Sequence, residues 1–172
     1  MIPELVTERL LLRRLELSDF DAYAAICADS EVRRYLGDGR PLERAAAWRE
    51  MALLLGHWGL RGFGQWAVVQ RETGELLGRA GLWQPEGWPG LEIGWVLGRP
   101  YWGRGFATEA ARATLNHAFS AMGAQHVISL VHPENERSIR VAQRLGERYE
   151  RDVELSRTPH HLYGIERDRW EG

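Results

Sequence analysis

The sequence predicts an α/β domain in which antiparallel strands come first and a strand–loop–helix–strand unit follows in the middle of the chain. Two observations support this class. A hairpin-like stretch occupies residues 64–83, and an alternating strand at 91–97 leads through several glycines into a helical stripe. The chain of 172 residues is long enough for one domain with a substantial core, and no repeat, low-complexity run or linker divides it. We therefore expect a single domain over residues 1–172.

The first expected elements are a strand and two helices. RLLLRRL, residues 9–15, reads as a strand. Ser18 is placed to cap a helix over 18–30, because acidic residues follow it in the first turn and apolar residues recur at helical spacing. A second helix is expected over 41–61 with Pro41 at its start, where the missing proline N–H costs no hydrogen bond.

A hairpin and a central strand come next. GQWAVVQR (64–71) and ELLGRAGLW (75–83) read as two strands joined by the turn RETGE. LEIGWVL (91–97) alternates, so its odd-numbered apolar residues share one face of the sheet. The opposite face then carries Glu92, Gly94 and Val96.

The second half of the chain alternates helices with strands. A helical stripe runs from Ala107 to Met122, and Gly123 closes it. HVISLVH (126–132) is a short apolar strand of the kind buried inside a sheet, and NERSIRVAQRLG (135–146) reads as a helix ended by glycine. RYERDVEL and HHLYGIERDRW read as two closing strands.

Composition excludes several classes of function. The net charge is −2, which gives no general reason to expect binding to nucleic acid or to an anionic membrane. No apolar run reaches the roughly 18 residues of a membrane span. The N-terminal apolar run is interrupted by acids and arginines, unlike a signal peptide, so we expect a cytosolic protein.

Metal, disulfide and P-loop chemistry are also not expected. Cys27 is the single cysteine and lies on an apolar helical stripe, which favours a buried structural thiol. The six histidines show no ligand spacing, so we predict no metal. All 22 basic residues are arginine, and a Walker A loop needs a lysine.

The glycine loop after residue 97 predicts an anion site. Gly98, Gly103 and Gly105 precede a helix whose first N–H groups lack internal partners. Glycines allow the backbone to approach a phosphate closely, and Arg104 adds a possible charged donor. A dinucleotide fold fits less well, because Thr108 follows in place of a third glycine and no ribose-binding acid comes at the required distance. A plain loop at a helix start is the other alternative.

This region resembles a known family. LEIGWVLGRPYWGRGFATEAARATL is similar to the acetyl-CoA-binding core of the GNAT superfamily of N-acetyltransferases, which carries Q/R-x-x-G-x-G/A. Residues 102–107 match this motif, with Trp102 in place of Gln or Arg. WGRGFATEA is typical of the branch of Rim-type ribosomal-protein N-terminal acetyltransferases. TERLLLRRLELSDFDAY and NERSIRVAQRLG also resemble that branch, so the resemblance spans nearly the whole chain.

The resemblance implies a fold and a cofactor site. The fold would be a central, mostly antiparallel sheet with splayed parallel strands 4 and 5 and about four helices. The backbone of Val96 and Leu97 would contact the pantetheine arm of acetyl-CoA and polarise its thioester. Asn135 would contact pantetheine or cap its helix. Arg140 would reach the 3′-phosphate of CoA, and a solvated helix face is the equally good alternative. The pyrophosphate would be bound by main-chain N–H groups of the loop, which belong to Trp102, Gly103, Arg104, Gly105, Phe106, Ala107 and Thr108.

The resemblance also implies catalytic residues. Glu92 would deprotonate the amine, because a protonated amine cannot attack a thioester. Ser138 would donate a proton to the departing thiolate. The simpler interpretations are an exposed carboxylate on a half-solvated strand and a serine that only contacts the cofactor.

The sequence thus predicts an enzyme that moves an acetyl group from acetyl-CoA to a primary amine by direct attack in a ternary complex. The acceptor would be a protein N-terminal α-amine, with a small-molecule amine as the alternative. No cysteine lies in the site motifs, so no covalent acyl-enzyme is expected. The resemblance allows a homodimer and gives no role to nucleic acid or membrane. A CoA-binding sensor or interaction domain without catalysis is the main alternative, and nucleotide binding a third.

Overall fold

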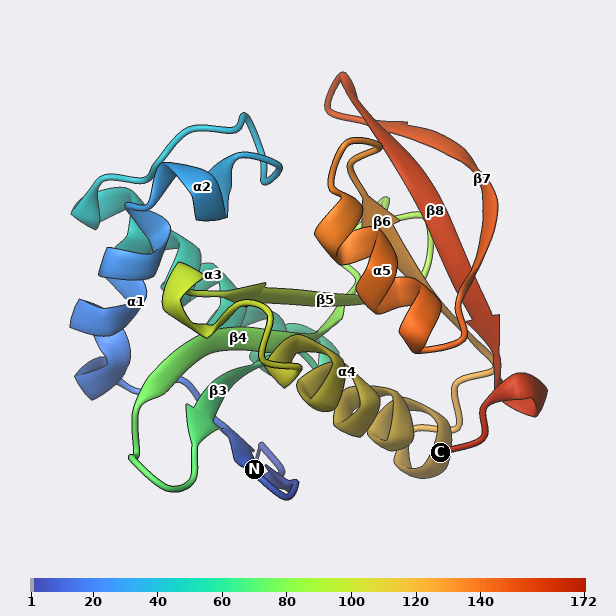
Figure 1. Ribbon diagram of the computed structural model, residues 1–172, viewed down its shortest axis with the longest axis horizontal. Coiled ribbons are helices and arrows are strands. Elements are labelled where there is room, and N and C mark those ends of the chain that lie inside the picture. The colour runs from blue at the N-terminus through green and yellow to red at the C-terminus, as the bar shows by residue number, and fades with distance from the viewer. Residues whose placement is uncertain (1) are drawn as a thin grey trace.

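The computed structural model describes residues 2–172 and contains one eight-stranded mixed sheet, flanked by helices on both faces (Figure 1). The strand order is β1-β2-β3-β4-β5-β6-β8-β7. Neighbouring strands are antiparallel except β5 and β6, which are parallel. This arrangement confirms the expected fold class. The expected parallel strands 4 and 5 correspond to β5 and β6 because a short strand precedes the first expected one.

Most strands follow the expected runs closely. Alternating or apolar segments pair in the register that buries one set of side chains. Their bounds are β1 Leu5–Val6, β2 Leu10–Arg13, β3 Gln65–Gln70, β4 Leu76–Trp83, β5 Glu92–Leu97, β6 His126–Val131, β7 Arg148–Leu155 and β8 Thr158–Glu166.

The helices divide between the two faces of the sheet. α1 and α3 pack on one face against β3 and β4 through one apolar cluster. α4 and α5 cover the other face, where apolar residues of both helices contact the middle strands. Figure 1 shows β5 in the middle of the molecule, with α1–α3 on one side and β6–β8 with α5 on the other. The helix bounds are α1 Phe20–Cys27, α2 Ser30–Arg33, α3 Arg44–Arg61, α4 Phe106–Asn116 and α5 Glu136–Arg144.

The start of α1 differs from the expectation. Ser18 does not cap a helix; it lies inside a 3-10 turn, Leu17–Asp19, and its hydroxyl is directed to Glu16. The Asp19 carboxylate accepts the Glu16 N–H at 2.8 Å and both terminal nitrogens of Arg13 at 2.7 Å. Asp19 thus ends the 3-10 turn as the partner of Glu16 in a capping box, and α1 begins at the next residue, Phe20.

Two further helix ends also differ. α3 begins at Arg44 instead of Pro41, because Glu43 is still extended and acts as the N-cap. α4 gives way after Asn116 to a short π-helix, His117–Ala121, and Met122 is exposed instead of completing the apolar stripe. Gly123 closes this stretch with φ of 70°, and Cys27 is buried, both as expected.

Candidate active site

The glycine loop lies between the end of β5 and the first turn of α4. Gly103 and Gly105 have φ of 73° and 81°, a left-handed backbone that side chains rarely adopt. A Cβ on Gly103 would have no heavy atom within contact distance. Glycine is therefore required here by the backbone conformation and not by crowding. Gly105 is the N-cap of α4, which leaves the first N–H groups of this helix without a side-chain cap and directed out of its N-terminus.

A cavity of about 290 Å³ lies against this loop and the helix start. Arg137, Arg140 and Arg144 from α5 line it and make it electropositive. Arg104 is not among its lining residues; its guanidinium lies 4.9 Å from the ring centroid of Phe106 instead. Every other residue expected to bind the cofactor lines the cavity, namely Val96, Leu97, Trp102, Gly103, Gly105, Phe106, Ala107, Thr108, Asn135 and Arg140.

Trp102, which departs from the family motif, ties the loop to the strand before it. Its indole N–H donates to the carbonyl of Leu97 at 2.8 Å. The guanidinium of Arg137 lies 4.1 Å from its ring centroid, which brings α5 against the loop. An aromatic residue here thus joins β5, the loop and α5, a role that the motif comparison did not indicate.

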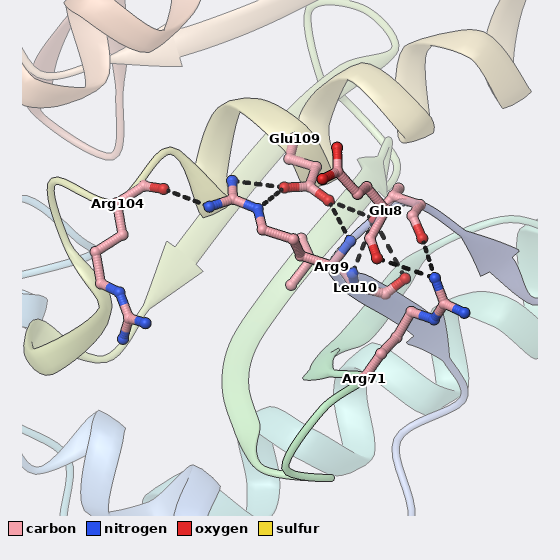
Figure 2. Close-up of polar contacts among 7 residues, drawn as sticks. Glu8, Arg9, Leu10, Arg71, Arg104 and Glu109 are labelled. Carbon is pink, nitrogen blue, oxygen red and sulfur yellow. Dashed lines mark hydrogen bonds and ion pairs between the residues drawn. The ribbon is translucent and has the colours of Figure 1, made fainter.

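The bend between β1 and β2 contacts the loop and the first turn of α4, as Figure 2 shows for Arg9, Arg104 and Glu109. Glu109, in the first turn of α4, accepts from the Arg9 backbone N–H at 2.9 Å and from its Nε at 2.7 Å. Arg9 Nη1 then donates to the carbonyl of Arg104 at 2.9 Å, while the Arg104 side chain points away from Arg9 (Figure 2). The Thr7 hydroxyl also donates to Glu109. The local sequence around Glu109 does not indicate this contact, because its partner Arg9 lies 100 residues away.

β5 and β6 are paired only near the start of β5 and diverge toward the end of β5 that leads into this loop. They share a single register pair, Glu92 with Ile128, and a hydrogen bond from the Ile128 N–H to the Leu91 carbonyl. Backbone groups alternate between the two edges of a strand, and the Gly98 N–H bonds to β4. Val96 therefore also directs its N–H to β4, whereas Leu97 directs its own to the open edge. Of the two expected backbone donors, Leu97 is the one free to contact a ligand.

A second cavity, of about 610 Å³, holds Glu92. The carboxylate lies beside Trp88, whose indole N–H donates to it at 2.7 Å. Burial raises the pKa of Glu92 to about 7, although the Trp88 indole and the Leu130 backbone N–H partly oppose this. A carboxylate with this pKa accepts a proton near neutral pH, which fits the base expected from the sequence.

The two cavities meet beside the middle of β5. Ser138 lies in the first turn of α5, and Asn135 caps that helix by accepting the Ser138 N–H at 3.2 Å. Glu92 and Ser138, the two expected catalytic residues, both line the larger cavity. The residues that line both cavities are Tyr35, Leu36, Trp95, Val96, Asn135 and Ser138.

A buried acid that the sequence did not indicate, Glu147, lies next to Ser129 of β6. Glu147 is only 4% exposed, and burial raises its pKa to about 8, with the charge of Glu92 adding to the effect. The Ser129 hydroxyl oxygen lies 3.0 Å from Glu147 Oε1 and 3.1 Å from the Ile93 carbonyl. A hydroxyl carries one proton, so a neutral Glu147 donating to Ser129 lets both contacts form. Nothing in the local pattern around Glu147 indicated this.

Comparison of the sequence and the fold with known proteins identifies the family of this chain. The GNAT acetyltransferase domain matches residues 9–148, so the chain belongs to the GNAT acetyltransferases and is an N-acetyltransferase. The uncharacterized N-acetyltransferase p20 of Bacillus licheniformis is 33% identical over 143 residues, which cover 82% of this chain and 80% of p20. An acetyltransferase structure from Agrobacterium tumefaciens superposes with a TM-score of 0.85 at 33% identity, over 96% of this chain and 95% of that one.

A more distant structure shares the fold. The ribosomal-protein-S5-alanine acetyltransferase of Vibrio fischeri matches with a TM-score of 0.76 over 99% of this chain and all of its own, at 18% identity. That identity shows the fold alone. Across residues 2–172, no helix is long and apolar enough to cross a membrane. Within the same range, no three histidine, cysteine, aspartate or glutamate side chains are grouped as a metal site would require.

Proposed function

We propose that this N-acetyltransferase transfers the acetyl group of acetyl-CoA to a primary amine by direct attack within a ternary complex. The favoured acceptor is the α-amino group of a protein N-terminus, and a small-molecule amine is the alternative. The observation that carries the proposal is the meeting of two cavities at Val96 and Ser138, with the Glu92 carboxylate in the larger one.

The smaller cavity has the features that acetyl-CoA requires. Left-handed glycines beside a free helix N-terminus suit phosphates, and the arginines of α5 suit their charge. The open edge of β5 suits the amide groups of the pantetheine arm. When bound there, acetyl-CoA supplies a thioester whose carbonyl carbon is the electrophile. Leu97 would direct its N–H at the carbonyl oxygen and stabilise the negative charge that develops on it.

The residues of the larger cavity would handle the protons. Glu92 takes a proton from the ammonium group of the acceptor, directly or through a water molecule. The freed amine nitrogen forms a bond to the acetyl carbon, the carbon–sulfur bond breaks, and the nitrogen releases its second proton to solvent as the amide forms. Ser138 donates a proton to the departing thiolate and recovers one from solvent. Because a thiol has a pKa of about 8.5, this last step is only weakly demanded at neutral pH.

The choice of an α-amino acceptor rests on two supports. The structurally similar Vibrio fischeri protein is named as an enzyme that acetylates an alanine of a ribosomal protein. An α-amino group has a pKa of about 7.7 to 8.0, which a base with a pKa of about 7 can deprotonate without a large energetic penalty. A lysine side chain, with a pKa of about 10.4, would require a stronger base.

Calorimetry with acetyl-CoA tests the cofactor site first. Gly105→Glu adds a side chain and a negative charge to the loop, and we expect it to abolish binding in a folded protein. Gly74→Glu is the matched control, because Gly74 has a similar φ of 72° and lies in the turn between β3 and β4. Wild-type protein that binds no acetyl-CoA, or loss of binding in both variants alike, would remove the cofactor assignment.

Turnover then tests the acceptor. Peptides with free N-termini and a panel of small primary amines are incubated with acetyl-CoA, and mass spectrometry locates the acetyl group. We expect acetylation at an α-amine. Acetylation confined to lysine side chains would contradict the proposed acceptor while leaving the cofactor site intact.

A further inference from the structure

The larger cavity contains a cluster of buried and half-buried charges that the proposed proton transfers do not use. Arg33 at the end of α2, Glu50 in α3 and Arg79 in β4 all line this cavity. Glu50 accepts from Arg33 Nη1 at 2.8 Å and from the Tyr23 hydroxyl at 2.7 Å. Arg79 Nη2 lies 3.6 Å from Glu50, and its Nη1 donates to Gln65 at 2.9 Å. One carboxylate thus lies between two guanidinium groups.

The charges of this cluster do not balance. Arginine side chains are cationic in proteins, and the nearby guanidinium groups and the Tyr23 hydroxyl lower the pKa of Glu50, so these three side chains carry one positive charge more than they carry negative charges. Glu92 in the same cavity, with its pKa raised to about 7, is only partly ionised near neutral pH and offsets this charge only in part. Burial raises the pKa of Tyr23 and of Cys27, so both stay neutral and contribute no negative charge. Within residues 2–172, the Nε atoms of Arg33 and Arg79 are buried and have no hydrogen-bond partner.

An unbalanced buried cation is costly for folding alone. Arg33 is only 7% exposed and the Arg79 side chain 15%, and removing guanidinium groups from water carries a desolvation cost unless partners compensate. Apolar side chains of similar size would stabilise such a position at least as well. The surplus positive charge therefore points to an anionic partner that arrives with a ligand of this cavity.

The cluster lies on the same face of the sheet as the proposed base. Arg79 pairs with Val96, and Trp83 pairs with Glu92, across β4 and β5. Directly opposed residues point to the same face, as do residues two and four apart along one strand. Arg79, Val96 and Glu92 therefore all face the larger cavity, and Arg79 is beside the point where the two cavities meet. The span from Val96 to Glu92 is about 13 Å along the strand.

We propose that the acceptor amine carries a carboxylate a few bonds from its nitrogen, and that Arg79 and Arg33 bind this carboxylate. The inference rests on the proposed acetyl transfer and narrows its substrate class. Guanidinium groups bind carboxylates with paired, charge-assisted hydrogen bonds. The surplus of one positive charge matches a monoanionic carboxylate better than a doubly charged phosphate. Binding the carboxylate at Arg79, opposite Val96, would hold the amine close to the point where the two cavities meet.

Two kinds of molecule present this chemistry. A free α-amino acid has a carboxylate two bonds beyond its amino nitrogen, and a peptide has one near its α-amine when its first residue is Asp or Glu. The experiment separates them. At saturating acetyl-CoA, kcat/KM is measured for each genetically encoded α-amino acid beside its carboxamide. The same is measured for peptides that begin with Asp or Glu beside the same peptides beginning with Asn or Gln.

In one of the two series, amino acids or peptides, we expect kcat/KM to be about tenfold or more higher for the carboxylate compound than for its amide partner. This ratio corresponds to about 1.4 kcal/mol. Arg79→Gln should bring this preference close to unity. Arg44→Gln is the control, because Arg44 is an exposed arginine on α3 that pairs with Asp21 outside the cavity. If Arg79→Gln does not fold, the carboxylate preference of the wild type and its loss in Arg33→Gln test the carboxylate site instead.

The outcomes distinguish this inference from the proposed function. Acetylation of both members of every pair with equal efficiency overturns the carboxylate site and leaves acetyl transfer to amines standing. If no amine in the panel is acetylated although acetyl-CoA binds, the proposed acceptors fail, and calorimetry with the same amino acids and acidic peptides decides about the site. Carboxylate-dependent binding that is lost in Arg79→Gln supports the site, and absence of any such binding overturns it.

Discussion

Replacing Glu147 by glutamine should stabilise the protein, and increasingly so as the pH rises. Glu147 is buried with a pKa of about 8, against its ordinary value of 4.5. The folded chain holds this proton more tightly than the unfolded chain, so the group favours folding fully below about pH 4.5. That contribution is lost progressively as the pH rises toward about 8, and levels off above it.

The magnitude follows from the two pKa values. Each unit between them is worth about 1.4 kcal/mol. Linkage then gives a cost of about 1 kcal/mol at about pH 5 and about 5 kcal/mol at about pH 9, a difference of about 4 kcal/mol. Glutamine keeps the size and a donor toward Ser129 but cannot ionise, so it removes this pH dependence. A change of this size is a large share of the roughly 5 to 15 kcal/mol that stabilises an ordinary domain.

Urea unfolding followed by tryptophan fluorescence measures this effect. The free energy of unfolding is determined at several pH values for wild type, for Glu147→Gln and for the control Glu166→Gln, an exposed glutamate at the end of β8. The difference between Glu147→Gln and wild type should grow with pH, whereas the control difference should stay flat. A constant difference for Glu147→Gln would mean that Glu147 ionises normally, and the hydrogen-bond argument through Ser129 would be wrong.

Three further changes test the site. Glu92→Gln should lower kcat about a hundredfold or more. It should also remove the rise in kcat that the wild type shows near pH 7, because a base acts only above its pKa. An unchanged pH profile of kcat would exclude Glu92 as the base. Glu109→Gln should weaken acetyl-CoA binding about threefold to tenfold by loosening the contact of Arg9 with the loop, and calorimetry with equal affinities would refute this. Asn135→Ala should lower stability by about 1 kcal/mol by removing the cap of α5, while Asn135→Asp keeps it; equal melting temperatures for these two variants would argue against the cap.

Much of the fold could be predicted from the sequence because its signals are local. The alternation in 91–97 placed Glu92 and Val96 on one face of β5, and the register with β4 agrees with this. The glycines before α4 indicated a loop open to an anion, and Gly103 and Gly105 adopt the left-handed conformation that such a loop requires. Helix starts were less predictable, since a 3-10 turn closed by Glu16 and Asp19 takes the place of the first turn expected at Ser18.

The sequence by itself determined the order of most elements, the glycine loop before α4 and the face of β5 on which Glu92 lies, because these depend on residues within one turn or strand of each other. Only the tertiary structure decided which distant groups meet. Strand order brings Arg9 to Glu109, and β6 brings Ser129 between Ile93 and Glu147. Packing of α2 and α3 on the sheet brings Arg33 and Glu50 to Arg79. Burial then sets the protonation of the acids, because the free energy of a charge depends on how much water the whole fold removes from it.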